Sequence, residues 1–148
     1  MSLIAEDALP DLRPVGRILR PRSIAIVGAS ADPRSFGGFV QGNLERFGYD
    51  GALHLVSRSS DEINGRACVK TVDALPEGID LAVLAIPEAG VMEAVQALAA
   101  RRCHAAVLFA SGYAEAGGDG PARQKALADA ASAAGILLVG PNCMGFTN

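Results

Sequence analysis

The sequence contains no tryptophan, and aromatic residues make up only 5% of its 148 positions. Half of the residues are hydrophobic, so alanine, valine, leucine and isoleucine must supply the core. This composition argues against an aromatic-rich β-sandwich and favours close-packed layers of helix and sheet. The length fits one domain with a sizeable core, but it is short for a complete enzyme that joins several substrates.

Long apolar runs are also missing, because none approaches the ~20 residues that a membrane-spanning helix requires. The N-terminus lacks the basic stretch followed by an apolar one that a secretory signal needs. We therefore expect a cytoplasmic protein with no membrane partner. The formal net charge is −3 and the basic residues are scattered, so no nucleic-acid partner is expected.

Cysteine and histidine are too few and too dispersed for a disulfide framework or a metal site. The three cysteines, Cys68, Cys103 and Cys143, form no C-x-x-C pair, which indicates reduced thiols. His54 and His104 have no cysteine or carboxylate at metal-ligand spacing. We predict no metal ligand. We also predict no catalytic residue, because no histidine lies near Cys143 in the sequence to activate it.

What the sequence does contain is a repeated alternation of apolar runs and helical segments. Continuous apolar runs predict strands that are buried on both faces. The expected strands are 23–27, 52–56, 80–86, 105–109 and 136–139, the expected helices are 11–20, 37–47, 88–101 and 121–134, and segment 61–72 is ambiguous. The predicted fold class is therefore α/β, a Rossmann-like doubly wound parallel sheet of about five strands with helices on both faces.

Two helices carry further signals. In the helix at 37–47, Phe39, Val40, Leu44 and Phe47 are spaced to form one apolar stripe, the face that a helix turns toward the core. The helix at 121–134 should end at Gly135, since glycine readily adopts the left-handed conformation that stops a helix.

Ligands of doubly wound sheets bind beyond the carboxyl ends of the strands, near the point where the strand order reverses. That rule selects five loops, at 28–36, 57–60, 86–88, 110–116 and 140–147. Each loop is rich in glycine, serine, proline or asparagine, which is typical of loops that face a ligand.

The first loop has the features of a phosphate-binding turn. Glycine directly after the strand allows a tight turn, and amides at the start of the next helix offer a seat for a phosphate. The predicted contacts are Gly28, Ala29, Ser30, Ala31, Asp32 and Pro33. The fingerprint G-x-G-x-x-G is absent, since Ser30 and Pro33 stand where its second and third glycines belong. A plain turn without a ligand remains the alternative.

The second strand ends in Ser57-Arg58-Ser59, with no acidic residue before Asp61. A site for NAD usually places an aspartate or glutamate there to hold the ribose hydroxyls. A cation between two hydroxyls suits a ribose that carries a phosphate, which is the 3′-phosphate of coenzyme A or the 2′-phosphate of NADP. The alternative is that Arg58 is a solvated surface charge.

The remaining loops offer small and apolar contacts. The third and fourth strands end in Ile86-Pro87 and in Ala110-Ser111-Gly112, which could pack an adenine or a pantetheine arm. Pro87 could equally do no more than begin the following helix. Asn142 follows the last strand, in a Gly-Pro-Asn turn that could present amide donors to an anion.

Five segments together carry a family resemblance. They are PRSIAIVGAS (21–30), DEING (61–65), DLAVLAIP (80–87), FASGYAE (109–115) and GPNCMG (140–145), in unbroken order. This ordered set resembles the CoA-binding domain of the succinyl-CoA synthetase α-subunit superfamily, and is most similar to the ADP-forming acetyl-CoA and related acyl-CoA synthetases. The resemblance covers residues 12–148.

The resemblance implies that coenzyme A is the bound cofactor and lies across the strand ends. Its phosphates would lie near 30–33, its 3′-phosphate near 57–59, and its adenine and pantetheine near 86–87 and 110–112. The predicted domain division is a leading segment with a short helix at 1–20 and a CoA-binding Rossmann-like domain at 21–148. The resemblance implies that this domain is a fragment of a larger synthetase and acts with ligase and ATP-grasp domains. The family joins an acid to CoA with ATP or GTP, through an acyl phosphate and a phosphohistidine that this chain does not contain.

One departure from the family bears on affinity. Relatives often carry Asn-Pro-Lys after the second strand, where this chain has Ser57-Arg58-Ser59. Two other interpretations stay open: a free-standing CoA-binding regulatory protein, and an NADP-binding oxidoreductase domain. Under the leading interpretation, this chain by itself should lack synthetase activity.

Overall fold

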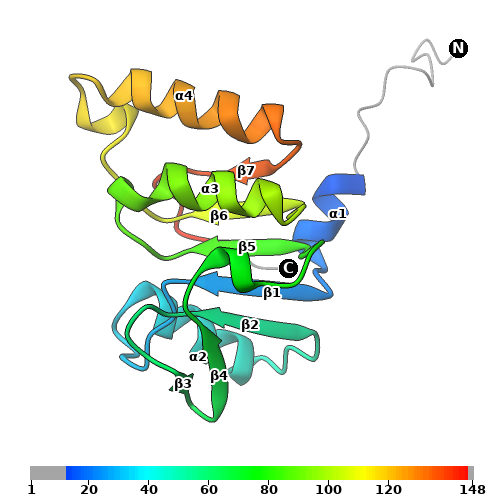
Figure 1. The fold of residues 1–148 in the computed structure, drawn as a ribbon. Coiled ribbons are helices and arrows are strands. Elements are labelled where there is room, and N and C mark those ends of the chain that lie inside the picture. The colour runs from blue at the N-terminus through cyan, green and yellow to red at the C-terminus, as the bar shows by residue number, and fades with distance from the viewer. Residues whose placement is uncertain (1–12, 147–148) are drawn as a thin grey trace, which may run out of the picture.

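The structure is a computed structural model that describes residues 13–146, and its elements follow the order expected from the sequence (Figure 1). The strands are β1 (Ser23–Val27), β2 (Ala52–Val56), β3 (Glu62–Ile63), β4 (Arg66–Val69), β5 (Leu81–Leu84), β6 (Ala105–Leu108) and β7 (Leu137–Val139). The α-helices are α1 (Arg13–Leu19), α2 (Phe36–Arg46), α3 (Val91–Ala100) and α4 (Gly120–Ala133). Short 3-10 turns are η2 (Val72–Ala74), η3 (Glu88–Gly90) and η4 (Ala114–Ala116).

The strands of the described residues form one sheet in the order β3-β4-β2-β1-β5-β6-β7. Only β3 is antiparallel to its neighbour, and the other adjacent pairs are parallel. Without β3, the order across the sheet is the 3-2-1-4-5-6 order of doubly wound dinucleotide-binding folds. The Rossmann-like prediction is confirmed, and the expected count of about five strands is corrected to seven.

The two additional strands come from the ambiguous segment 61–72. They lie at the edge of the sheet, where Glu62, Arg66 and Ala67 are exposed. An edge strand therefore lacks the continuous apolar run by which the five central strands could be predicted.

Helices cover both faces of the sheet (Figure 1). On one face, α3 and α4 contribute Val95, Leu98 and Leu127 to a core cluster with the buried strand residues Ala82 and Leu84. The other face is covered by α1 and α2, which bring Ile18, Val40 and Leu44 to a second cluster around β1 and β2. At the end of α4, Gly135 has a φ of +70°, so the predicted helix stop is confirmed.

The predicted apolar stripe of α2 is wrong in part. Phe39 and Phe47 are 58% and 78% exposed, whereas the residues of α2 buried against the protein are Gly37, Gly38 and Gln41. The physical reason is close backbone contact: a Cβ on Gly37 would lie 2.1 Å from the carbonyl oxygen of Gly28. Since only glycine fits there, the glycines rather than the phenylalanines set the inward face of the helix.

Cys103, between α3 and β6, is the most protected thiol and is 4% exposed. Burial raises the pKa of this thiol to about 11, so it stays protonated at neutral pH. Because the folded-state pKa is raised, the stabilisation from keeping the thiol neutral is complete below about pH 9 and is lost as the pH rises toward 11.

We therefore expect iodoacetamide at pH 8 to modify Cys103 last, after the partly exposed Cys68 and Cys143. Peptide mass mapping over time measures the order, and labelling in urea, where the three rates should converge, is the control. Early modification of Cys103 in the folded protein would contradict its burial.

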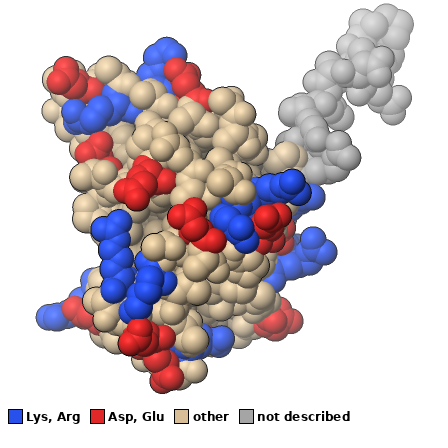
Figure 2. All heavy atoms as spheres, viewed as in Figure 1, with Lys and Arg blue, Asp and Glu red and all other residues tan. Residues whose placement is uncertain are grey.

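Two surface properties are relevant to partners. Among residues 13–146, no helix is both long enough and apolar enough to cross a membrane. On the face seen in Figure 2, basic and acidic side chains are interspersed, and no broad patch of one sign is visible.

Candidate functional site

The parallel strands bring five loops together at one edge of the sheet, and the arrowheads of β1, β2 and β5 point to this side in Figure 1. Backbone hydrogen bonds join neighbouring loops. The Ala29 N–H donates to the Val56 carbonyl at 3.0 Å, and the Asn142 N–H donates to the Ala110 carbonyl at 3.0 Å. We call this region the carboxyl edge, defined as residues 28–35, 57–60, 85–88, 110–113 and 140–145.

All residues predicted from the sequence to contact the ligand lie at the carboxyl edge. They are Gly28, Ala29, Ser30, Ala31, Asp32, Pro33, Ser57, Arg58, Ser59, Ile86, Pro87, Ala110, Ser111, Gly112 and Asn142. The strand order reverses between β1 and β5, so the 28–35 and 85–88 loops flank the point where doubly wound sheets bind ligands. The structure places these residues in loops along one edge of the sheet, and their contact with a ligand stays a prediction.

Gly28 permits the tight turn after β1. Its φ is +91°, and a Cβ would lie 2.3 Å from the Ala85 carbonyl oxygen and 2.9 Å from a methyl group of Ile86. Any larger residue would therefore push the 28–35 and 85–88 loops apart at the reversal point.

Hydrogen bonds within the 28–35 loop fix its shape. The Asp32 N–H donates to Ser30 Oγ at 3.1 Å, and the Asp32 carboxylate accepts from the Arg34 N–H at 2.9 Å. Two further bonds of 3.0 Å join the Arg34 guanidinium to both carboxylate oxygens. The hydrogen bonds from Arg34 lower the pKa of the Asp32 carboxyl. The acidic charge in this loop is thus neutralised locally by Arg34.

The start of α2 is capped and packed against this loop. Ser35 is the N-cap residue, and its Oγ accepts from the Gly38 N–H at 3.1 Å. A Cβ on Gly38 would lie 2.1 Å from the Asp32 carbonyl oxygen, so the helix begins directly under the turn. Gly37 and Gly38 do what the third glycine of the dinucleotide fingerprint does, which is to allow close packing of helix and strand. The sequence analysis selected the amides at the start of this helix, but it did not predict the packing role of the two glycines because it looked for glycine only at 30 and 33.

At the end of β2, Ser57 is buried and its Oγ accepts from the Ser60 N–H at 3.3 Å. Arg58 and Ser59 are exposed. Sequence reasoning missed Lys70, which follows β4 and donates to the Ser60 carbonyl at 3.0 Å. The signal for Lys70 is spatial, because only the pairing of β2 with β4 brings it to this loop.

Side chains of Glu115 and Arg123 hold the loop that follows β6. The Glu115 carboxylate accepts from the N–H groups of Gly112 at 2.6 Å and Tyr113 at 3.2 Å, and the Gly112 bond is the main reason why the pKa of Glu115 is lowered. Arg123 donates to the Gly112 carbonyl at 2.7 Å. Both backbone groups of Gly112 are therefore occupied within the protein, while Ser111 is exposed at the edge.

The last loop is held against β6. Asn142 has a φ of +52°, and the Cys143 N–H donates to the Leu108 carbonyl at 3.2 Å. Phe109, at the end of β6, stacks on Phe36 at the start of α2 with ring centroids 5.1 Å apart. The ends of β6 and β7 are thus joined to the start of α2.

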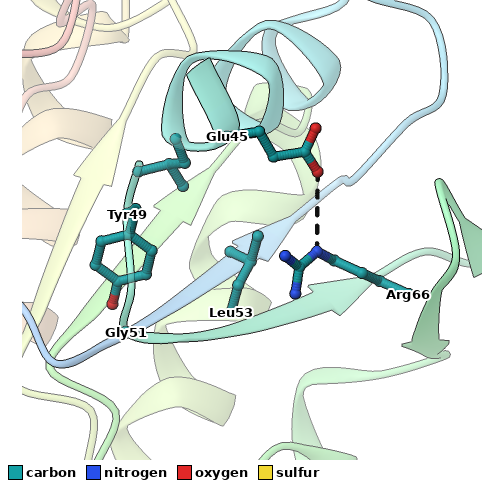
Figure 3. Close-up of a pocket in the computed structure, with 6 residues that line it drawn as sticks. Glu45, Tyr49, Gly51, Leu53 and Arg66 are labelled. Carbon is teal, nitrogen blue, oxygen red and sulfur yellow. Dashed lines mark ion pairs between the residues drawn. The ribbon is translucent and has the colours of Figure 1, made fainter. Parts of the chain in front are cut away.

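A separate hollow of about 210 Å³ lies at the opposite edge, near the amino ends of β2 and β4 (Figure 3). Its lining residues are Leu44, Glu45, Tyr49, Gly51, Leu53 and Arg66. Glu45 and Arg66 point toward each other and form an ion pair of 3.8 Å. Burial raises the pKa of the Tyr49 phenol, whose OH donates to the Pro21 carbonyl at 3.2 Å. These polar groups are partnered, and the hollow lies at the opposite end of the strands from the edge where doubly wound sheets bind ligands, so the carboxyl edge stays the candidate site.

Between residues 13 and 146, no group of three or more histidine, cysteine, aspartate or glutamate side chains is arranged to hold an ion.

The fold and the carboxyl edge define a Rossmann-type nucleotide-binding domain. A family model described as the CoA binding domain matches residues 22–148, and the chain belongs to this family. It is homologous to the CoA-binding domain of ADP-forming acyl-CoA synthetases.

Three relatives illustrate the similarity. A trans-feruloyl-CoA synthase from an unknown prokaryotic organism is 41% identical over 134 residues, which is 90% of this chain and 19% of that protein. The ADP-forming acetate–CoA ligase I of Archaeoglobus fulgidus is 33% identical over 132 residues, 89% of this chain and 19% of the ligase. The solved acetyl-coenzyme A synthetase 1 of Ca. Korarchaeum cryptofilum, in complex with phosphate and ADP, is 30% identical with a TM-score of 0.83, and the match covers 88% of this chain and 28% of that one. The chain thus spans about a fifth of the length of the two curated relatives.

Proposed function

We propose that the carboxyl edge binds coenzyme A, as a substrate, and that the chain serves as the CoA-binding domain of an NDP-forming acyl-CoA synthetase. The observation that supports this most directly is the meeting of three groups at one edge. They are the glycine turn at Gly28, the capped helix start at Ser35, and the cation Arg58 after β2, where an NAD site places an acid.

In this proposal each loop takes one part of the ligand. The diphosphate lies against the 28–35 loop, near the positive end of the α2 dipole, and Asp32 does not repel it because Arg34 neutralises that carboxylate. The 3′-phosphate of the ribose faces Arg58. The pantetheine arm passes Ile86-Pro87 and Ala110-Ser111-Gly112.

The chemical step requires more than this chain offers. The proposed reaction converts an acid, CoA and ATP or GTP into acyl-CoA, a nucleoside diphosphate and phosphate. The residues described here bind and orient CoA, and we propose that ligase and ATP-grasp domains supply the phosphohistidine and the nucleotide site. The loop at Gly140-Pro141-Asn142 would face those domains. The three free cysteines suit a reducing cytoplasm.

Calorimetric titration of the 148-residue chain with CoA, dephospho-CoA and NADPH tests the ligand. We expect CoA to bind most tightly, because it alone combines the 3′-phosphate with the pantetheine arm. Tighter binding of NADPH would instead favour the oxidoreductase interpretation, and no binding of CoA would remove the proposal.

Arg58→Ala should weaken CoA binding roughly tenfold and leave dephospho-CoA nearly unchanged, since the lost contact is one charge-assisted hydrogen bond to the 3′-phosphate. Arg46→Ala is the matched control, because Arg46 is an exposed cation at the far end of α2, over the ring of Phe47. Equal losses for the two ligands would show that Arg58 does not contact the 3′-phosphate.

A further inference from the structure

Lys70 lies beside the loop that follows β2, although ten residues or more separate them in the chain. β2 and β4 pair in parallel, with Leu55 opposite Cys68 and Val56 opposite Val69. The Ser57 N–H donates to the Val69 carbonyl at 2.9 Å. The residue after each strand is therefore at the carboxyl edge, and Lys70 is the neighbour of Ser57 across the sheet.

The contacts of Lys70 hold its ammonium group at this loop. Nζ donates to the Ser60 carbonyl at 3.0 Å and pairs with Asp61 Oδ1 at 2.8 Å. An ammonium group has three donors, so these two contacts leave one N–H for a further acceptor. The protein thus fixes the position of the Lys70 ammonium group and leaves one of its N–H donors for a ligand.

The ion pair between Lys70 and Asp61 is exposed to solvent. The Asp61 side chain is 94% exposed and that of Lys70 is 48% exposed, so water competes for both groups. Exposed pairs of this kind contribute little to stability. A stronger anion that arrived at the loop could therefore take the place of the Asp61 carboxylate at little cost.

A second cation lies in the same loop. Arg58 is exposed and forms no ion pair among residues 13–146. A phosphate monoester carries nearly two negative charges at neutral pH and accepts several hydrogen bonds. One guanidinium and one ammonium, at a loop that also carries the exposed Ser59, match that chemistry.

We infer that Lys70 is a specificity-determining residue, which exchanges Asp61 for the phosphate on the ligand's ribose and so favours phosphorylated over unphosphorylated ribose. The inference rests on the proposed function, because doubly wound sheets hold the ribose at the end of the second strand. Asp61 keeps the ammonium in place while the site is empty and competes with the phosphate when the ligand binds.

Titration of the 148-residue chain with CoA and with dephospho-CoA, which lacks only the 3′-phosphate, tests this role. Lys70→Gln should weaken CoA roughly 5- to 20-fold and change dephospho-CoA less than about twofold, because the lost contact is a charge-assisted hydrogen bond. Lys70→Arg should retain most of the preference. Asp61→Asn should tighten CoA by about two- to fivefold, since it removes a competing charge at an exposed site.

Lys125→Gln is the matched control, because Lys125 forms a similar surface pair with Asp129 (2.6 Å) on α4. It should leave both affinities unchanged, and circular dichroism should show that all variants fold. If Lys70→Gln weakens both ligands equally, or weakens neither, the role of Lys70 is refuted while CoA binding stands. If the wild-type chain binds neither ligand, the proposed function itself fails.

Discussion

Gly38→Ala should lower the free energy of unfolding by roughly 2–3 kcal/mol and weaken CoA binding, because overpacking at a rigid contact forces the backbone to move. The added Cβ would lie 2.1 Å from the Asp32 carbonyl oxygen and 3.0 Å from that of Ser30. Both are main-chain atoms of the 28–35 loop, which cannot turn aside as a flexible side chain would. Urea unfolding measures the stability, and calorimetry measures the affinity.

The same helix offers a matched control. A Cβ on Gly42 would have no atom within 4 Å, so Gly42→Ala introduces the methyl group without a clash. Alanine is the better helix former, and this variant should be more stable than the wild type by about 0.5–1 kcal/mol with CoA affinity unchanged. If Gly38→Ala is as stable as Gly42→Ala, α2 does not pack on the loop as described.

Asp80→Ala should cost about 2 kcal/mol of stability, because a partly buried backbone donor loses its buried acceptor. Asp80 is 4% exposed, and its carboxylate accepts from the Arg22 N–H at 2.8 Å. The Asp80 N–H donates to Ser23 Oγ at 3.0 Å, which ties the start of β1 to the start of β5. Asp129→Ala, which breaks only the exposed pair with Lys125, should stay within about 0.5 kcal/mol of the wild type.

Asp80 is at the opposite end of the strands from the carboxyl edge, since it precedes β5. At a temperature where the variant remains folded, its CoA affinity should therefore equal that of the wild type. Asp80→Ala and Gly38→Ala thus separate stability from binding: both should unfold more easily, and only Gly38→Ala should bind less well. Weaker CoA binding by Asp80→Ala would place the ligand elsewhere.

The fold could be predicted from the sequence wherever a strand is buried on both faces. β1, β5 and β6 are continuous apolar runs, and the parallel order followed from their alternation with helices. β3 and β4 could not be predicted because half-exposed edge strands carry residues such as Glu62 and Arg66. Phe39 misled the prediction for α2, since its spacing suggested burial while backbone contact at Gly37 and Gly38 decided the orientation.

The candidate site could be assigned to one edge of the sheet because a general rule of parallel sheets selects the loops. The rule does not say which side chains from other elements reach those loops. Lys70 directly follows β4, and the place of β4 next to β2 is set by the sheet and not by the chain order. The capping role of Ser35 and the packing role of Gly38 were not predicted, because their spacing from Gly28 departs from the familiar fingerprint.

The cations near the carboxyl edge are mostly matched by nearby acids, as Arg34 is by Asp32, Lys70 by Asp61 and Arg123 by Glu88. The protein as a whole carries a net charge of −3. An anionic ligand that approaches from solution therefore meets no extended attractive field, and its arrival gains nothing from long-range steering. Selectivity among ligands at the carboxyl edge therefore depends on the dissociation rate. A ligand stays bound longer when its own negative charges have replaced the acidic side chains as partners of the cations.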